Sequence, residues 1–225
     1  MRVRCRCPYM NRGLILCGLA LLLSVVTPAA AFAQQREPVG PFAVDVRGAL
    51  ARFKEDAAVA ATLDVDPSNL PTRGLGLAAG AHWYPLRRGR ISLGIGGEIL
   101  WARDSRTGET EENATAPAPT VTTRLSMLSP HVSLNFGHRD GWSYISGGIG
   151  RASLTAERND VSYPGDAGQT RMTHYGGGAR WFTGPHLAFT FDVRFYTINA
   201  TPAAGTRPAF PRTRMMVISA GVSLR

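Results

Sequence analysis

The sequence predicts an all-β fold: one eight-stranded antiparallel up-and-down transmembrane β-barrel. Apolar and polar residues alternate in about eight separate segments, and side chains of a strand point alternately to opposite faces, so each segment is expected to form a strand with one apolar face. Several segments reach about ten residues and carry a charge near their middle, which is typical of outer-membrane strands. The connections alternate long and short, as a barrel with short periplasmic turns and longer outer loops requires.

Residues 1–33 are interpreted as a secretory signal peptide. Four arginines lie between residues 2 and 12, an apolar run covers 13–26, and small residues lead to Ala33. The alternative is a transmembrane anchor, but the run has about 14 residues and a spanning helix needs about 20. We therefore expect cleavage after Ala33, and one outer-membrane β-barrel domain over residues 34–225.

Charge and cysteine content exclude several classes of function. The formal charge of +9 falls to +5 when the four N-terminal arginines are removed, and all three cysteines lie in the expected signal peptide. The mature chain would therefore have no disulfide, thiol nucleophile or cysteine metal site. Its arginines are scattered through strands and turns rather than clustered, which argues against nucleic-acid binding. The histidines match no metal motif, so we expect no metal and no cofactor.

Stretches rich in turn residues separate the eight expected strands. The strands are expected at residues 41–53, 72–84, a segment that ends near 103, 121–136, 142–155, 171–183, 186–199 and 212–225. The long loops are expected at residues 54–70, 104–120, 156–169 and 200–211, and short turns at 85–89 and 137–141. The seventh strand is the clearest, because Phe189 and Phe191 alternate with Thr190 and Asp192.

Two further patterns concern the faces of the strands. Glycines such as Gly76, Gly80 and Gly96 lie on the polar face; glycine weakens a solvent-facing strand but leaves room in a crowded lumen, so this face is predicted to point inward. The alternative is a soluble lipocalin-type barrel, whose apolar face points inward. The apolar parity of residues 121–136 shifts around Pro130, which predicts a β-bulge there. The faces of residues 142–155 are not assigned.

Six inward charges form the candidate site, a lumen charge network. They are Asp45, Arg47, Glu98, Arg180, Asp192 and Arg194. Opposite charges in a low-dielectric interior should pair, and an eight-stranded barrel is just wide enough for side chains to fill it. We expect a plug of salt bridges, with a narrow selective pore as the alternative. Four tryptophans near strand ends are expected to be interfacial aromatics: Trp83, Trp101, Trp142 and Trp181.

Two other features concern chemistry and binding. His131 and Ser133 share one strand face and superficially resemble the His-x-Ser pair of outer-membrane lipid A deacylases, but the nearest acid is Asp140, and a pair without an orienting carboxylate is a weak catalytic motif. We expect no catalytic residue. The loops at 54–70 and 104–120 each hold four acidic residues. These carboxylates are hypothesised to bridge divalent cations to lipopolysaccharide phosphates, or to bind an external partner.

A family resemblance rests on three sequence segments. Residues 176–186, with the sequence GGGARWFTGPH, are followed by Asp-Val-Arg-Phe-Tyr at 192–196, and the chain ends in Ala-Gly-Val-Ser-Leu-Arg at 220–225. This pattern resembles small bacterial outer-membrane β-barrel proteins of the OmpA, OmpX and OmpW type. The resemblance implies placement in the bacterial outer membrane, contact with its lipids and lipopolysaccharide, and recognition of the last strand by the assembly machinery. One departure is Arg225, because such signals usually end in an aromatic residue.

The expected function is non-enzymatic, a structural or surface-interaction role for a monomeric barrel. The alternatives are a narrow passive channel for small solutes, an outer-membrane lipid hydrolase that uses His131 and Ser133, and a soluble lipocalin-like binding protein. The sequence names no ligand.

Overall fold

A computed structural model describes residues 41–108, 118–138, 140–163 and 168–225 of the chain. The expected signal peptide, with its cleavage site after Ala33, lies outside these residues. So do residues 109–117 of the second long loop. Within the described ranges, no helix has the length and apolarity that a membrane span requires.

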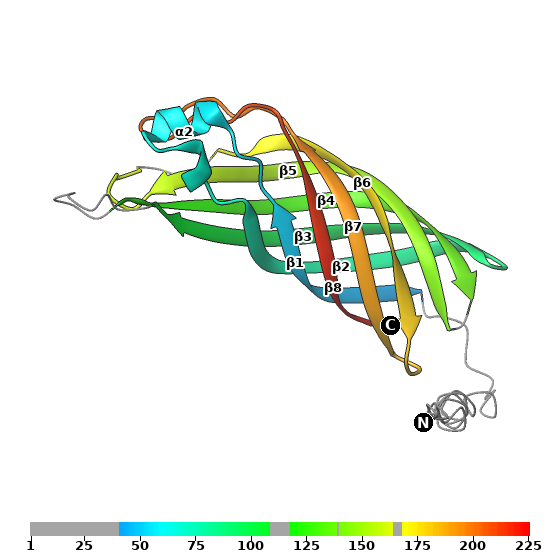
Figure 1. The fold of residues 1–225 in the computed structure, drawn as a ribbon. Helices are drawn as coiled ribbons and strands as arrows, with labels where there is room; N and C mark the ends of the chain where they lie inside the picture. Colours follow the sequence, from blue (N-terminus) through cyan, green and yellow to red (C-terminus); the bar gives the residue numbers. More distant parts are fainter. Residues whose placement is uncertain (1–40, 109–117, 139, 164–167) are drawn as a thin grey trace, which may run out of the picture. The chain divides into compact units, whose positions relative to one another are not determined.

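Eight strands form a closed barrel in which each strand pairs antiparallel with the next, and β1 pairs with β8 (Figure 1). This arrangement confirms the predicted fold. The strands are β1 (Phe42–Arg52), β2 (Arg73–Arg88), β3 (Ile91–Thr107), β4 (Thr120–His138), β5 (Gly141–Arg158), β6 (Thr170–Phe182), β7 (Leu187–Ile198) and β8 (Thr213–Leu224). A short helix, α2 (Ala57–Leu63), and the 3-10 turn η1 (Pro67–Asn69) connect β1 to β2.

The predicted bulge at Pro130 is wrong. The β3–β4 register runs without a shift through the pair Gly97↔Pro130. Leu125 and Met127 point inward and are buried, whereas Val132 is exposed on the outside. The parity change has another cause. The residues of β4 before Pro130 lie in the half of the barrel whose interior is apolar, so their apolar side chains point inward.

The register shift lies instead on β2, between Trp83 and Leu86. Pro85 falls in this irregular stretch, where its missing N–H costs no ladder hydrogen bond. The tight turn expected at residues 85–89 is therefore wrong in position, because β2 continues to Arg88 and the chain reverses after it. Gly89 adopts a positive φ of 61° at this reversal, a conformation that glycine accepts readily.

The outer surface of the barrel is apolar. Exposed large side chains cover every strand, with Leu75 72% and Ile149 70% exposed, while charged groups such as Asp45 and Arg180 are buried. Apolar residues outside and charges inside are the arrangement of a membrane barrel. The lipocalin-type alternative requires the reverse and is excluded.

Three of the four tryptophans lie on this surface, and the fourth does not. Trp83, Trp101 and Trp181 are 47%, 53% and 49% exposed. Trp142 is only 8% exposed and lies inside the barrel, edge-on to Tyr84 and with its ring centroid 5.5 Å from that of Phe182. The expectation that Trp142 is interfacial is wrong, because the even-numbered residues at the start of β5 point inward.

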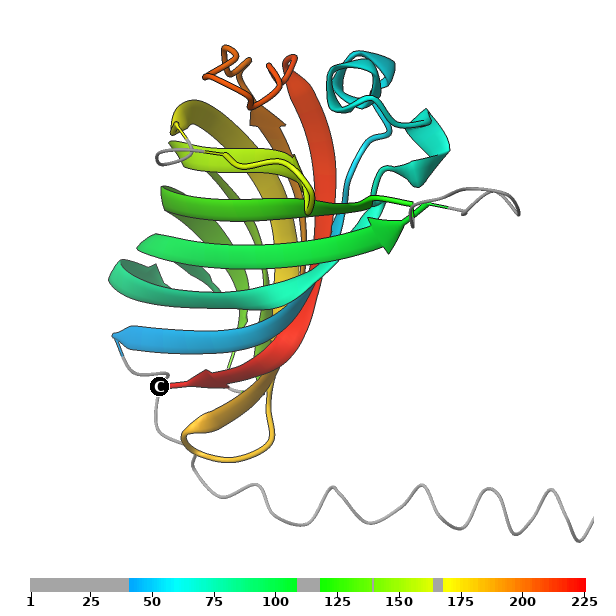
Figure 2. The same ribbon diagram turned by 90° about the vertical axis from the view of Figure 1, so that its left-hand side faces the viewer.

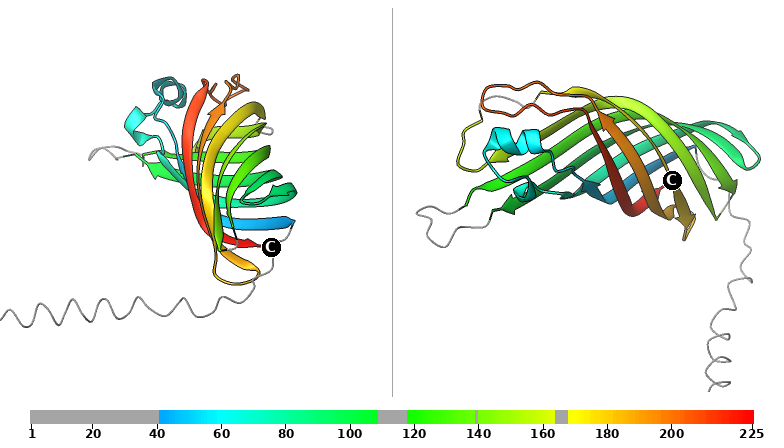
Figure 3. Two further views of the ribbon diagram at one scale, coloured as in Figure 1. Left: turned by 90° about the vertical axis from the view of Figure 1, so that its right-hand side faces the viewer. Right: turned by 45° about the horizontal axis from the view of Figure 1, so that its top comes forward.

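Three strands extend well beyond the others at the end of the barrel where α2 lies. β3, β4 and β5 have 17, 19 and 18 residues, whereas β1, β6, β7 and β8 have 11 to 13. Figures 1 and 3 show these strands projecting as a sheet, with α2 beside it and the β7–β8 connection across from it. We call these projecting strand ends, residues 104–107, 120–123 and 153–158, the platform.

The helix in the loop at 54–70 was not predicted. The Asp56 carboxylate caps it by accepting hydrogen bonds from the backbone N–H groups of Ala58 and Val59. Its buried face packs onto the inner side of the platform through contacts with Val121 and Ala156. Figure 2 shows the helix and the β7–β8 connection together at this end.

Replacing Asp56 with alanine is expected to loosen α2. Loss of an N-cap costs about 1 kcal/mol of helix stability. We expect limited proteolysis of the connection between β1 and β2 to become several-fold faster, while the barrel keeps its heat-dependent gel mobility. The matched control is Glu55→Ala, which removes an exposed acid of the same loop. Equal proteolysis of both variants would show that the cap does not hold the helix.

Candidate functional site

The candidate site is a layer of buried charges across the middle of the barrel interior, here called the charged layer. The structure brings together all six residues of the expected lumen network. Each has an exposed fraction of 5% or less: Asp45, Arg47, Glu98, Arg180, Asp192 and Arg194. They come from β1, β3, β6 and β7, at the polar positions of the alternation. Three guanidinium groups face three carboxylates, so the layer is formally neutral.

One half of the charged layer is centred on Asp45. Arg180 donates from Nη2 to Asp45 Oδ2 at 2.8 Å and from Nε to Oδ1 at 3.2 Å. His82 Nε2 lies 2.8 Å from the same Oδ2. Arg180 also donates to the Tyr84 hydroxyl at 2.9 Å. This multidentate geometry satisfies both carboxylate oxygens, as burial of a charge requires.

The other half joins the remaining four charges. Arg47 pairs with Glu98 through Nη2, and its Nη1 lies 3.5 Å from Asp192 Oδ2. Arg194 donates to Asp192 from Nε at 2.8 Å, and its Nη1 lies 3.5 Å from Glu98 Oε1. Each arginine thus contacts both carboxylates. This crossed arrangement fixes the relative positions of β1, β3 and β7.

Two tyrosines complete the hydrogen bonding of these carboxylates. Tyr144 donates to Asp192 at 2.6 Å, and Tyr196 donates to Glu98 at 3.0 Å. Sequence reasoning missed both residues. The alternation in β5 does not define its two faces, and Tyr196 is one of several polar-face residues of β7 that carry no charge.

The charged layer lies between two apolar layers. Toward the short turns, the aromatic layer contains the buried residues Ala43, Tyr84, Trp142, Tyr144, Phe182 and Ala188. On the other side, the upper apolar layer contains leucine, methionine and alanine side chains, among them Leu100, Leu125, Met127, Met172 and Val217. Side chains therefore occupy the interior at three successive levels, as expected for eight strands.

A row of histidines crosses the interior beside the charged layer. His131 Nε2 lies 3.4 Å from His82 Nδ1, and the ring centroids of His131 and His174 are 5.7 Å apart. Gly96 and Gly148 lie between these rings on the intervening strands: a Cβ at Gly96 would come within 2.7 Å of His82 Nδ1 and 3.0 Å of His131 Nε2. Within the described ranges, no three ligand-type side chains are placed to hold a metal ion.

The position of His131 and Ser133 argues against the lipid hydrolase alternative. Both residues are buried in the interior, 4% and 3% exposed, rather than placed on the barrel exterior. The Ser133 hydroxyl accepts a hydrogen bond from Asn135 Nδ2 at 3.1 Å. The contacts of His131 are with the rings of His82 and His174. Neither residue of the pair can therefore meet a lipid on the outer surface.

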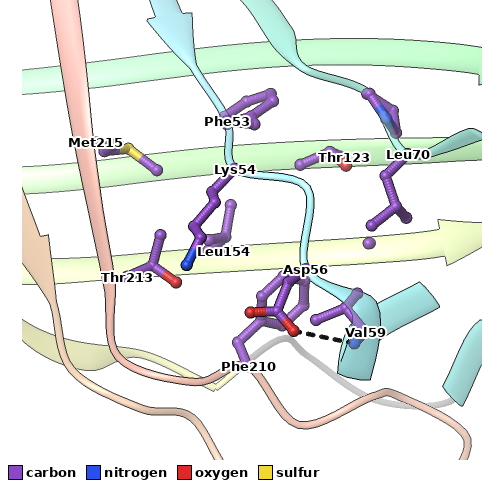
Figure 4. A pocket seen from close by; sticks show the side chains of 12 residues that line it. Phe53, Lys54, Asp56, Val59, Leu70, Thr123, Leu154, Phe210, Thr213 and Met215 are labelled. Atoms are coloured by element: carbon purple, nitrogen blue, oxygen red, sulfur yellow. Dashed lines mark hydrogen bonds between the residues drawn. The ribbon is translucent and has the colours of Figure 1, made fainter. Parts of the chain in front are cut away.

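The end of the barrel near α2 is covered. Figure 4 shows Phe53, Leu154 and Phe210 among the side chains that line a pocket next to the start of α2, together with Lys54 and Thr213. The pocket that these residues line has a volume of about 20 Å³, room for roughly one water molecule. A second pocket, of about 230 Å³, shares Leu154, Ala156 and Phe210 with it. The β7–β8 connection supplies Phe210, so this cover combines two segments distant in sequence.

Two acids of the loop at 54–70 have structural roles. Asp56 caps α2, and Asp66 accepts a hydrogen bond from the Ser68 backbone N–H at 2.8 Å. Hydrogen bonding from the Ser68 side chain, and then from this N–H, lowers the pKa of Asp66. At the end of β5, Asp160 accepts two hydrogen bonds from Arg158, which lower its pKa. These carboxylates are partnered within the protein. The acids of residues 109–117 lie outside the described residues.

The closed antiparallel barrel, its apolar outer surface and its charged interior define the chain as a transmembrane β-barrel. The chain belongs to the outer membrane protein β-barrel domain family, which matches residues 17–225.

The chain is similar to several solved structures. Neisserial surface protein A (NspA) has a TM-score of 0.52 at 14% identity, over 84% of this chain and 99% of that one. Ail, the attachment invasion locus protein of Yersinia pestis, has a TM-score of 0.47 at 14% identity, over 83% and 98%. The outer membrane protease OmpT from Escherichia coli has a TM-score of 0.41 at 8% identity, over 87% and 99%. The likeness to NspA, at 14% identity, concerns the fold alone. No curated protein sequence matches the chain.

Proposed function

We propose that this chain is a non-enzymatic, monomeric protein of the bacterial outer membrane, exported by its N-terminal signal peptide, that acts through a surface interaction at its outer end. The observation that carries the proposal is a contrast between the interior of the barrel and its projecting strand ends. The interior is filled and its outer end is covered, whereas β3, β4 and β5 project several residues farther than their neighbours. Groups available to a partner therefore concentrate on the platform and the outer connections.

The composition of the platform supports this assignment. On its outer face, Ser105 Oγ lies 2.9 Å from Thr122 Oγ1, and Thr107 Oγ1 lies 2.9 Å from Thr120 Oγ1. Such a ladder of exposed hydroxyl groups is unsuited to hydrocarbon and suited to hydrogen bonding in water. Its place beyond the apolar surface supports a position outside the membrane.

The filled interior argues against the passive channel. An ion crossing the barrel would have to separate the pairs of Asp45 with Arg180 and of Arg47 with Glu98, all buried. Removing one partner from a buried pair costs about 3–5 kcal/mol. We expect no discrete openings in planar bilayers. Discrete openings that change with Glu98→Ala or Asp192→Ala would favour the channel and contradict the proposal.

The direct test of the proposal is to shorten the platform. Residues 105–122 would be replaced by a short glycine-containing turn, which removes the last three β3–β4 pairs and leaves the ladder from Ile91↔Phe136 to Asp104↔Thr123 intact. We expect vesicles that carry this variant to lose most of their binding to immobilised polysaccharides and matrix proteins, with heat-dependent gel mobility unchanged. The matched control replaces residues 87–92, the end of the β2–β3 hairpin at the other end of the barrel, by a two-residue turn. Equal binding by the parent barrel and by empty vesicles would contradict a surface role.

A further inference from the structure

Arginines encircle the outside of the barrel at one level, and we call this set the arginine belt. On seven of the eight strands, the row of outward-facing apolar residues is followed, toward the platform end of the barrel, by an exposed arginine. The seven are Arg52, Arg73, Arg103, Arg124, Arg151, Arg171 and Arg214. On β7 the corresponding outward position is Thr197, the partner of Arg214. The belt therefore marks the level at which the apolar surface ends.

The strand register places six of these arginines directly opposite one another in three pairs. The pairs are Arg52↔Arg73, Arg103↔Arg124 and Arg151↔Arg171. Like charges directly opposite on neighbouring strands destabilise a sheet. Among the described residues, Arg124 is the only belt arginine that forms an ion pair with a carboxylate. Its Nη1 lies 2.7 Å from Glu157 Oε2. Anions from outside the chain would neutralise the excess positive charge at this level.

One pair borders a groove that is divided into a cationic and an apolar part. The groove has a volume of about 550 Å³ and lies on the outside of β2–β5. Arg103, Arg124 and Arg207 line one part, and Arg207 donates to Glu157 at 3.1 Å. The other part is lined by side chains that are more than half exposed: Leu75, Leu77 and Trp101.

We propose that this groove binds a phosphorylated, multiply acylated glycolipid of the outer leaflet, with the chemistry of lipid A. A phosphate lies between the guanidinium groups of Arg103 and Arg124, and acyl chains lie along Leu75, Leu77 and Trp101. Guanidinium groups bind phosphate in a bidentate manner, which suits a belt made wholly of arginine. Three arginines against one glutamate leave the groove with a net charge of +2, which a phosphate dianion neutralises. This proposal rests on the membrane placement and is independent of what the platform binds.

The test measures which lipid stays bound to the barrel. The full-length protein, purified from membranes, is placed in phosphatidylcholine vesicles that contain bisphosphorylated lipid A, monophosphorylated lipid A or phosphatidylglycerol. Retained lipid is counted by native mass spectrometry after mild detergent extraction. We expect bisphosphorylated lipid A to be retained preferentially. The double variant Arg103→Gln/Arg124→Gln should lower its retention at least about tenfold, because two charge-assisted contacts are lost.

The matched control is Arg171→Gln/Arg214→Gln, which removes two belt arginines, equal in charge, from β6 and β8, strands that contribute no residue to the groove. If the control variant retains lipid A within about twofold of the parent barrel, the groove is supported as the binding site, since a twofold change is well under 1 kcal/mol. Equal loss in both double variants would overturn the site, because it would show an effect of net charge alone. Equal retention of phosphatidylglycerol and lipid A would also overturn it. Heat-dependent gel mobility verifies that each variant is folded.

Discussion

Replacement of Asp45 by alanine is expected to lower the free energy of unfolding by about 3–5 kcal/mol, because it leaves a buried cation without its partner. Asp45 is fully buried, and it accepts two or more hydrogen bonds from Arg180 besides its contact with His82. After the change, Arg180 would keep the Tyr84 hydroxyl as its hydrogen-bond partner. The measurement is urea unfolding in phospholipid vesicles, followed by heat-dependent gel mobility.

Two controls make this result specific. The double variant Asp45→Ala/Arg180→Met is expected to recover much of the loss, because it removes the unpaired charge as well. Glu157→Ala breaks ion pairs near the surface and should cost no more than about 1 kcal/mol. If Asp45→Ala unfolds at the same urea concentration as the parent barrel, the charged layer does not hold the barrel together.

Replacement of Gly96 by alanine is expected to destabilise the barrel by about 1–3 kcal/mol, because the site has no room for a methyl group. A Cβ at Gly96 would lie 2.7 Å from the Ala81 carbonyl oxygen and 2.7 Å from His82 Nδ1. The backbone of β2 cannot yield without disturbing its pairing with β1 and β3, so the histidine row must separate. The same urea titration measures the loss.

The neighbouring glycine provides the matched control on the same strand. Gly97 points outward, and an added Cβ there would meet only the Ser129 carbonyl oxygen, at 3.9 Å. Gly97→Ala is therefore expected to be neutral or to stabilise by up to about 1 kcal/mol, through the smaller entropy of the unfolded chain. If both substitutions have the same effect, Gly96 is not kept small by the packing of the interior.

Most of the fold could be predicted because alternation with a period of two reports the two environments of a barrel strand. The same rule identifies the interior charges: once the outer face is apolar, Asp192 and Arg194 have only the lumen to occupy. The rule fails where the interior changes from polar to apolar. Leu125 and Met127 point into the upper apolar layer, so their parity looks like a bulge that the structure does not contain.

Other features depend on contacts that one sequence does not reveal. The seven residues of α2 are too few for a helical period, and the helix exists because Asp56 caps it and the platform buries one face. The inward position of Trp142 follows from the register of β5, whose alternation is diluted by glycine and serine. The histidine row also requires the register, which aligns His131 on β4 with Gly148 on β5 and His174 on β6.

The layered interior also removes an ambiguity that the outer surface leaves. A strand could slip along its neighbour by two residues, about 7 Å, and still present apolar groups to lipid, because alternation repeats every second residue. Inside, such a slip of β6 would move Arg180 to the level of Phe182, among the rings of the aromatic layer and away from Asp45. The stagger on which closure of the cylinder depends is thus encoded by the order of side chains in the lumen, and the lipid-facing surface is free to vary in sequence.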